Sequence, residues 1–382
     1  MKRILSIFLM ISLVMSETVL GENEAKIQSD YYVLMEADSG KIIEAKNENE
    51  TRSPASITKI MTTLLIFDAI KEGKIKLDEM VVTSGHAKSM GGSQVFLEEG
   101  EEQTVETMIK CILIASGNDA SVAMAERIGG TEEKFVEQMN EKAKKLGMEH
   151  THFVDCCGLT DSKEHFTTAK DVAVMTRELV TRYPEVLNYS SIWMETIIHK
   201  TAKGEKEFVL SNTNKLLKGN EYVKGLKTGS TSLAKYCVSN VAVKDGITLI
   251  SVVLGAPDFK VRFADSNQLI NLGFSKCKIY KDSEKDYQVP IIGGVKDTVA
   301  AKKKETKLVD TEGIDFQQIR KNEVINPKIL APVKKGKILG KIQYSIGKKK
   351  LAETEIVAEE TVLEGTYLDS IGKIAGVFLG VQ

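Results

Sequence analysis

A long apolar stretch begins directly after Pro54. From Ile57 to Ile70, apolar residues occupy nearly every face of a helix, which is typical of an element buried in a core. Pro54 interrupts the preceding segment, and Gly73 lacks the side chain that disfavours a left-handed helix end. We therefore predict a buried helix that starts near Ser56 and ends at Gly73.

Further helices are predicted where apolar residues recur at helical spacing behind a polar residue that can cap a helix. The predicted helices are Thr104 to about Ser116, one from Asp119, Thr131 to Leu146, Thr168 to just before Pro184, and Asp258 to Leu272. The segment between residues 77 and 100 is rich in glycine and is predicted to be mainly loop, with Val95-Phe96-Leu97 as a short apolar anchor.

Strands are predicted at both ends of this helical region. Two apolar stretches flank the turn Ala37-Asp38-Ser39-Gly40 and predict a β-hairpin, and Asp245-Gly246 predicts a second one. The predicted strand segments are 31–35, 41–44, 208–210, 236–238 and 247–254. Strands on both sides of a helical middle indicate an antiparallel sheet built from distant segments, and hence an α+β fold.

The remaining parts of the chain predict the other domains. Residues 1–21 combine two basic residues with a short apolar run, which indicates a signal peptide because a spanning helix needs about 20 apolar residues. We expect a catalytic domain at 28–273 and a small all-β domain at 277–364, where segments are short and alternating. Residues 365–382 predict an amphipathic helix, which fits both a membrane surface and packing on the β domain.

Composition excludes some classes of function. The 382 residues carry a formal net charge of -1, so the strongly basic surface that nucleic-acid binding requires is not indicated. Five cysteines form no disulfide framework, and we expect Cys111 and Cys237 to be small buried hydrophobes. His150, His152 and the pair Cys156-Cys157 are close in sequence, but no second ligand pair completes a zinc spacing, so we predict no metal and no cofactor.

Three short motifs carry the candidate chemistry. Ser56 and Lys59 are one helical turn apart, so the amine can reach the hydroxyl as a base reaches a nucleophile. Ser116-Gly117-Asn118 lies at a predicted helix break, and Lys227-Thr228-Gly229 precedes the strand at Tyr236. In order and type, these motifs resemble those of the penicillin-recognising serine enzymes.

Additional segments make the resemblance more specific. They are Pro54 to Thr62, Gly117 to Ala120, Gly158-Leu159, His165 to Asp171 and Gly225 to Gly229. With them, residues 31–273 are similar to the low-molecular-weight penicillin-binding proteins, the D-alanyl-D-alanine carboxypeptidases of the penicillin-binding-protein-5 type (serine peptidase family S11). Asp155, Cys156 and Cys157 depart from the family pattern.

The resemblance implies an antiparallel sheet flanked by helices, as in serine β-lactamases and DD-peptidases, and an exported enzyme of peptidoglycan biosynthesis that β-lactams acylate. It implies Ser56 as nucleophile, Lys59 as base, Ser116 as proton relay and Asn118 as a hydrogen-bonding partner. Its substrate site would comprise Lys227, Thr228, Gly229, Ser230 and Arg262, with the backbone N–H groups of Ser56 and Ser230 as oxyanion hole. We expect His165 to be a structural hydrogen bonder.

The sequence leaves two alternative functions open. A class A β-lactamase has the same three motifs, but its usual Glu-x-x-Leu-Asn pattern is absent between Ser116 and Lys227, so rapid penicillin hydrolysis is not predicted. A penicillin-binding sensor or structural wall protein would be acylated without turnover. Retention of all three motifs favours turnover.

Overall fold

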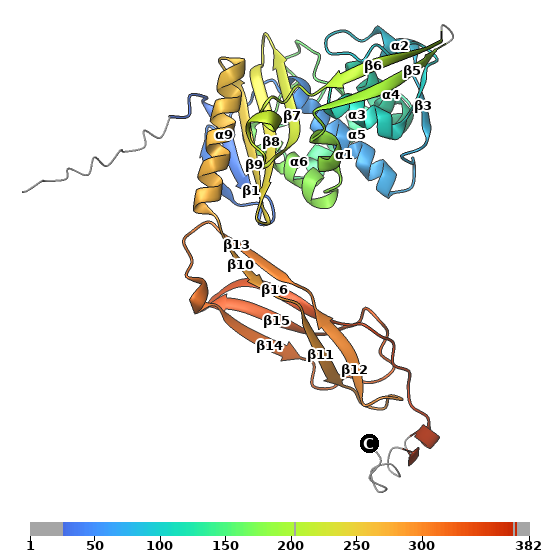
Figure 1. Ribbon diagram of the computed structural model, residues 1–382, viewed down its shortest axis with the longest axis vertical. Helices are drawn as coiled ribbons and strands as arrows, with labels where there is room; N and C mark the ends of the chain where they lie inside the picture. Colours follow the sequence, from blue (N-terminus) through green and yellow to red (C-terminus); the bar gives the residue numbers. More distant parts are fainter. Residues whose placement is uncertain (1–25, 202–203, 370, 373–382) are drawn as a thin grey trace, which may run out of the picture.

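A five-stranded antiparallel sheet forms the centre of the N-terminal half of the computed structural model, which describes residues 26–201, 204–369 and 371–372 (Figure 1). Its strand order is β2 (Ile42–Lys46), β1 (Tyr31–Glu36), β9 (Ile247–Ala256), β8 (Lys235–Lys244) and β7 (Val223–Thr231). β1 pairs with β9 in the register Tyr31 to Leu254, so the sheet joins distant segments as predicted. The α+β prediction is confirmed.

Alternation along the strands sends side chains into two separate cores. Leu34 of β1 packs with Leu269 and Ile270 of α9 (Phe259–Lys276), which lies along one face of the sheet (Figure 1). Val33 and Met35 point to the opposite face and join the larger core under the other helices. The sheet is therefore a layer between α9 and a helical subdomain.

The helical subdomain follows the predicted capping residues closely. Thr104, Thr131 and Thr168 each accept a hydrogen bond from the backbone N–H three residues later, at 3.1, 3.3 and 3.0 Å. The elements of this part are α1 (Lys59–Lys71), α3 (Val105–Leu113), α4 (Asn118–Gly129), α5 (Glu132–Lys145), α6 (Ala169–Arg182) and α7 (Val186–Ser190), while α8 (Leu216–Gly219) packs in the core beside α9. The predicted left-handed glycine at the end of α1 is confirmed, with φ of 72° at Gly73.

One local prediction was wrong, that of a three-residue apolar anchor at 95–97. The segment 77–100 is mainly loop as predicted, with β3 (Met80–Val82) and α2 (Gly85–Ser89) inside it and β4 (Glu102–Thr104) after it. Within it Phe96 is 65% exposed, while its neighbours Val95 and Leu97 are buried, so only two of the three residues anchor the loop. Lys227-Thr228-Gly229 precedes the strand at Tyr236, which is β8, as predicted, and itself lies inside β7. β5 (Met194–Thr201) and β6 (Gly204–Ser211) form a separate hairpin.

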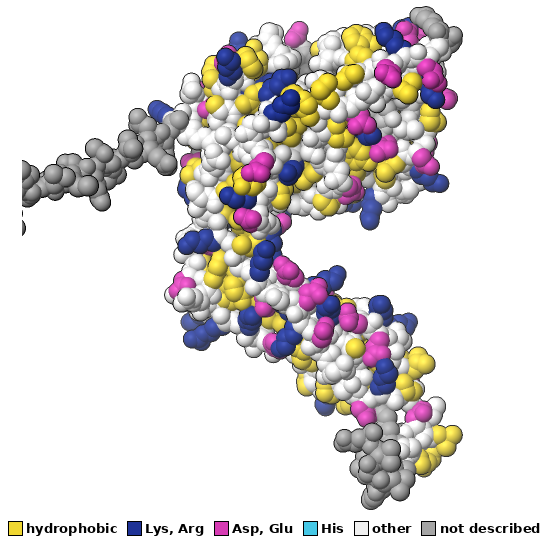
Figure 2. Space-filling model, viewed as in Figure 1, with side chains coloured by type: hydrophobic (Ala, Val, Ile, Leu, Met, Phe, Trp, Pro, Cys, Tyr) yellow, Lys and Arg dark blue, Asp and Glu magenta, His cyan; other side chains and the backbone are white. Residues whose placement is uncertain are grey.

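The C-terminal half is a small all-β unit with its own core, as predicted. Its main sheet has the order β11 (Lys285–Pro290), β12 (Thr298–Lys303), β16 (Lys349–Ala358), β15 (Ile338–Ile346) and β14 (Arg320–Ile325), beside the pair β10 (Lys278–Asp282) and β13 (Thr306–Asp310). Asp38 in the β1–β2 turn pairs with Lys307 at 2.8 Å, which links the two halves. Figure 2 shows charged side chains of both signs over this unit.

Some predictions concern residues at the two ends of the chain. The predicted signal peptide and most of the predicted C-terminal helix, including Ile374 and Phe378, lie outside the described residues. Within residues 26–201, 204–369 and 371–372, none of the helices has both the length and the apolar character that crossing a membrane requires.

Truncation of Ile270 tests the layer between the sheet and α9. Ile270 is fully buried there, so Ile270→Ala should lower the free energy of unfolding by about 2–5 kcal/mol through lost burial and a residual cavity. Val209→Ala on the exposed face of β6 is the control and should change it by less than about 0.5 kcal/mol. Urea denaturation followed by circular dichroism measures both; equal stabilities of the two variants would contradict this packing.

Candidate active site

Ser56 and Lys59 lie at the junction of two helical segments. Ala55 has a φ of 47°, and the short 3₁₀ turn Ala55–Thr58 leads into α1, whose first residue is Lys59. The helix predicted from Ser56 therefore begins as a 3₁₀ turn and continues as an α-helix from Lys59. The lysine Nζ still lies 3.0 Å from Ser56 Oγ, so the predicted pairing of hydroxyl and amine is present.

The Lys59 amine is fully buried and held by three oxygen atoms. Besides Ser56 Oγ, its Nζ donates to Asn118 Oδ1 at 2.6 Å and to the Cys157 backbone oxygen at 2.8 Å. Burial lowers the pKa of Lys59, while the nearby Cys157 opposes that effect. An amine with this environment is easier to deprotonate than a free lysine.

The second motif is bent so that Ser116 and Asn118 face the same space. Ser116 has a left-handed φ of 63°, and its Oγ accepts a hydrogen bond from Lys227 Nζ at 2.9 Å. Asn118 is fixed from the other side, because its Nδ2 donates to the Gly91 oxygen and its backbone N–H to the Ser93 oxygen, each at 2.7 Å. The loop at 91–93 therefore orients the amide that holds Lys59.

Asp119 secures this loop, a role that the sequence motifs did not identify. The buried carboxylate accepts from the backbone N–H groups of Val95 and Leu97 at 3.1 Å and of Ala120 at 2.9 Å. In the sequence, an aspartate in the first turn of α4 indicates only that a helix starts there. The partner loop is about 20 residues earlier in the chain, so only the fold shows the connection.

The third motif brings a second buried amine into the site from β7. Lys227 Nζ donates to Ser116 Oγ and to the Thr228 oxygen, both at 2.9 Å. Burial holds the pKa of Lys227 well below its usual range, and the positive charges of a protonated Lys59 and of Arg262 lower it further. The lowered pKa of Lys59 has burial as its main cause, and the repulsion acts on Lys227.

Gly229 allows β7 to approach Ser56 closely. A Cβ atom there would lie 2.9 Å from the Pro54 oxygen and 3.0 Å from the Ser56 backbone nitrogen. Any side chain would therefore force the strand away from Ser56. Ser230, the next residue, is exposed on the site side of the strand end, while Thr228 Oγ1 is hydrogen-bonded to Thr213 Oγ1 at 2.7 Å.

Arg262 lies behind the strand, where α9 packs on the sheet. Its Nη1 donates to the Gly229 oxygen at 3.1 Å and to the Cys237 oxygen at 3.3 Å, and its Nε has no hydrogen-bond partner within the described residues. Burial lowers the pKa of Arg262. The guanidinium thus supports the Gly229 peptide and adds positive charge beneath β7.

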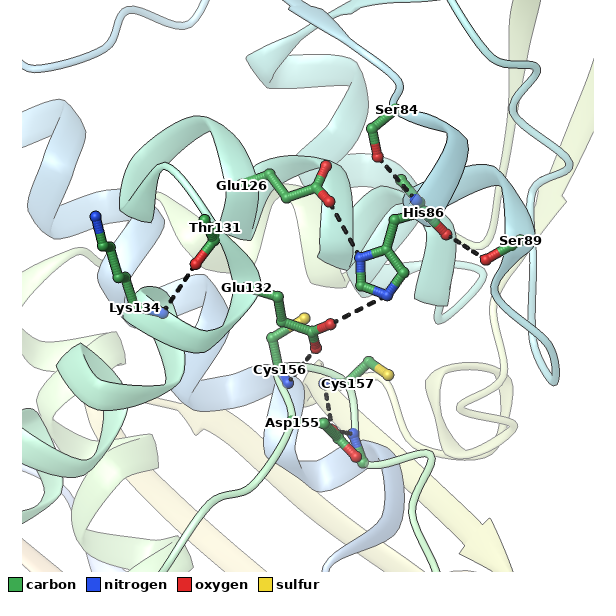
Figure 3. Close-up of polar contacts among 12 residues, drawn as sticks. Ser84, His86, Ser89, Glu126, Thr131, Glu132, Lys134, Asp155, Cys156 and Cys157 are labelled. Atoms are coloured by element: carbon green, nitrogen blue, oxygen red, sulfur yellow. Dashed lines mark hydrogen bonds and ion pairs between the residues drawn. The ribbon is translucent and has the colours of Figure 1, made fainter.

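The loop whose Cys157 carbonyl accepts from Lys59 also contains Cys156. Figure 3 shows the side chains that hydrogen-bond to the backbone of this loop. Glu132 accepts from the Cys156 backbone N–H at 3.0 Å, and Asp155 accepts from the Cys157 N–H at 2.8 Å. Glu132 also faces His86, whose other ring nitrogen is 3.1 Å from Glu126. The contribution of this loop to the site is a backbone carbonyl, so no side-chain pattern could have predicted it.

His165 and the cysteines have the structural roles expected of them. His165 Nε2 is 2.8 Å from Thr58 Oγ1, and its Nδ1 accepts from the Val154 N–H, which confirms a structural hydrogen bonder. Cys111 and Cys237 are buried and free, also as expected. Within the part of the chain that the structure describes, no three His, Cys, Asp or Glu side chains are grouped to hold a metal ion.

Comparison with known sequence families agrees with this geometry. Residues 18–258 match the family of D-alanyl-D-alanine carboxypeptidases that forms peptidase family S11, and residues 274–364 match the C-terminal domain of penicillin-binding protein 5. The chain belongs to the D-alanyl-D-alanine carboxypeptidase family. The resemblance inferred from the three motifs is thereby confirmed, including the penicillin-binding-protein-5 type.

Individual relatives cover nearly the whole carboxypeptidase chain. D-alanyl-D-alanine carboxypeptidase DacF of Bacillus subtilis is 38% identical over 98% of each chain. The crystal structure of penicillin-binding protein 5 from Haemophilus influenzae is 30% identical and superimposes with a TM-score of 0.67, covering 89% of this chain and 98% of that one. Penicillin-binding protein 3 of Streptococcus pneumoniae is 26% identical, with a TM-score of 0.70 over 88% and 100% of the two chains.

Substitution of Gly229 tests the close approach of β7 to the nucleophile. Gly229→Ala should reduce the rate of acylation by penicillin at least about tenfold, because the added methyl group must displace Pro54 and Ser56. The control is Gly219→Ala, where the added atom meets only a side-chain carbon at 3.5 Å. Stopped-flow acylation rates and thermal unfolding would be measured together; a folded Gly229→Ala protein with the wild-type rate would contradict the proposed contact.

Proposed function

We propose that the Ser56 hydroxyl attacks the carbonyl carbon between two terminal D-alanine residues while Lys59 accepts its proton. The enzyme is a serine-type D-Ala-D-Ala carboxypeptidase, and Ser56 would carry its acyl-enzyme. The observation that supports these roles best is the position of Lys59 Nζ, 3.0 Å from Ser56 Oγ and hydrogen-bonded to two further oxygens. A nucleophile and a base within hydrogen-bonding distance are the requirement for such a step.

The partners of Lys59 fit a neutral amine. A neutral amine has two N–H donors and one lone pair, and Asn118 Oδ1 and the Cys157 oxygen can only accept. Those two acceptors take both N–H groups, which leaves the lone pair for the Ser56 hydroxyl. Burial lowers the pKa of Lys59 and so favours this protonation state.

Ser116 and Lys227 would complete the proton transfer. As the peptide bond breaks, the leaving D-alanine nitrogen needs a proton, and Ser116 Oγ can donate one and recover another from Lys59 or Lys227. Its left-handed backbone and its hydrogen bond to Lys227 hold the hydroxyl in place. Water then attacks the Ser56 ester, and the shortened peptide leaves with its new carboxylate.

The substrate would lie along β7. Lys227 and Thr228 would bind the terminal carboxylate. Burial disfavours the charged form of Lys227 in the free enzyme, and the bound carboxylate would favour that form again. The backbone N–H groups of Ser56 and Ser230 would stabilise the oxyanion. Arg262 would act mainly as a positioning residue for Gly229, with its charge assisting carboxylate binding.

The cellular setting follows from the same chemistry. Enzymes of this family act on peptidoglycan peptides outside the cytoplasm and bind β-lactams, and we propose that this chain trims stem pentapeptides and is acylated by β-lactams at Ser56. We further propose the domain division at 28–273 and 277–364, export by residues 1–21, and attachment of residues 365–382 to the membrane surface. A non-turnover sensor is the alternative, and D-alanine release distinguishes the two.

Removal of the nucleophile tests the acyl-enzyme directly. Ser56→Ala should lose covalent labelling by fluorescent penicillin and reduce D-alanine release by at least about 10³-fold, because the hydroxyl that forms the ester is removed. Ser275→Ala, at an exposed position near the end of α9, is the control and should retain labelling. Labelling of Ser56→Ala at the wild-type level would show that another residue is the nucleophile.

Lys227→Ala tests the carboxylate site. The loss of a buried amine beside Ser116 should raise KM for a D-Ala-D-Ala peptide and lower kcat/KM by about 10²-fold or more, since charge-assisted contacts to the carboxylate disappear. Lys224→Ala, at an exposed-side position on the same strand, should keep kcat/KM within about twofold. Unchanged kinetics in Lys227→Ala would place the carboxylate elsewhere.

A further inference from the structure

A hollow of about 220 Å³ opens beside the segment that leads into the nucleophile. It is lined by Thr51, Arg52, Ser53, Ser162, Lys163, His165, Phe166 and Leu233. Ser53 is three residues before Ser56, and His165 is hydrogen-bonded to Thr58 in the same 3₁₀ turn. The hollow therefore adjoins the catalytic serine, although none of the residues assigned to catalysis lines it.

The charge of this hollow is positive. Arg52 and Lys163 contribute two cations, no carboxylate is among the lining residues, and within the described chain neither cation forms an ion pair. His165 adds no charge, because its Nδ1 accepts the Val154 N–H and its remaining N–H is directed at Thr58. Hydroxyl groups of Thr51, Ser53 and Ser162 supply additional hydrogen-bond donors.

The direction of β7 indicates which part of a substrate reaches the hollow. The proposed terminal carboxylate site is at Lys227 and Thr228, and the proposed oxyanion hole is at Ser230, further along the same strand. The acyl portion of the peptide must therefore continue past Ser230 towards the β7–β8 turn. Leu233 lies in that turn, three residues after Ser230, and lines the hollow.

We propose that this hollow is a subsite for a carboxylate carried by the acyl portion of the peptide, two or three residues before the scissile bond. Arg52 and Lys163 bind it as an ion pair, and the surrounding hydroxyls complete its hydrogen bonds. Arg52 is held in position because its guanidinium stacks on Tyr31 at 4.4 Å from the ring centroid. The inference depends on the substrate orientation of the proposed function.

Paired substrates test the subsite. Two synthetic peptides ending in D-Ala-D-Ala would differ only in a carboxylate or a carboxamide at the second residue before the scissile bond. The wild-type enzyme should prefer the acid by about threefold to tenfold in kcat/KM, mainly through KM, because half-exposed ion pairs contribute modestly. Raising the salt to about 0.5 M should reduce this preference.

Variants identify the residues responsible. In Lys163→Gln and Arg52→Gln the ratio of acid to amide should fall towards one, and in Lys163→Glu it should fall below one. Lys163 is exposed, so its replacement leaves the core intact, which keeps the test valid if Arg52→Gln misfolds. Lys145→Gln is the control: it removes an exposed lysine that pairs with Glu141 and lines a hollow at the far end of α1 from Ser56, and it should retain the wild-type ratio.

The outcomes separate this inference from the proposed function. A wild-type ratio near one, or the same ratio in wild type and Lys163→Glu, would overturn the subsite while D-alanine release still upholds the proposed function. No D-alanine release from either peptide would contradict the proposed function, and the subsite with it. A salt-sensitive preference that Lys163→Glu reverses would establish the subsite.

Discussion

The burial of the Lys59 amine is the constraint on which the catalytic half of the molecule depends. A lysine with no access to water must either have its hydrogen bonds satisfied or lose its proton, and here three oxygens from three separate segments surround it. One belongs to the 3₁₀ turn, one to α4 and one to the Cys156-Cys157 loop. The same contacts that satisfy the amine therefore hold these segments together as one site.

The surrounding fold can be understood as support for this arrangement. Asp119 fixes the loop whose carbonyls orient Asn118, and Glu132 fixes the loop whose carbonyl faces Lys59 (Figure 3). On the other side, β7 approaches the nucleophile closely because Gly229 has no side chain. Asp119, Glu132 and Gly229 thus position groups that surround Ser56 and Lys59, which is the kind of preorganisation that catalysis requires.

Much of this could be predicted from the sequence, because local patterns determine local structure. Capping threonines, the Asp245-Gly246 turn and the three motifs depend on neighbours a few residues away, and they gave the helices, the hairpin and the family. The features that could not be predicted depend mostly on contacts between residues far apart in the sequence. The Cys157 carbonyl and the loop held by Asp119 contribute backbone atoms or distant contacts that no spacing encodes. The left-handed Ala55 at the start of the 3₁₀ turn has no sequence signal of its own.

The central claim is that a neutral Lys59 activates Ser56. The pH dependence of the rate of acylation by penicillin tests it most directly, measured in wild type and Lys59→Arg from about pH 5 to about pH 10. A base must be deprotonated to act, so the wild-type rate should rise with pH through an ionisation below 10.5, the ordinary pKa of lysine. Lys59→Arg should be nearly inactive, because a guanidinium stays protonated. A wild-type rate that is flat across this range, or substantial acylation of Lys59→Arg, would contradict the claim.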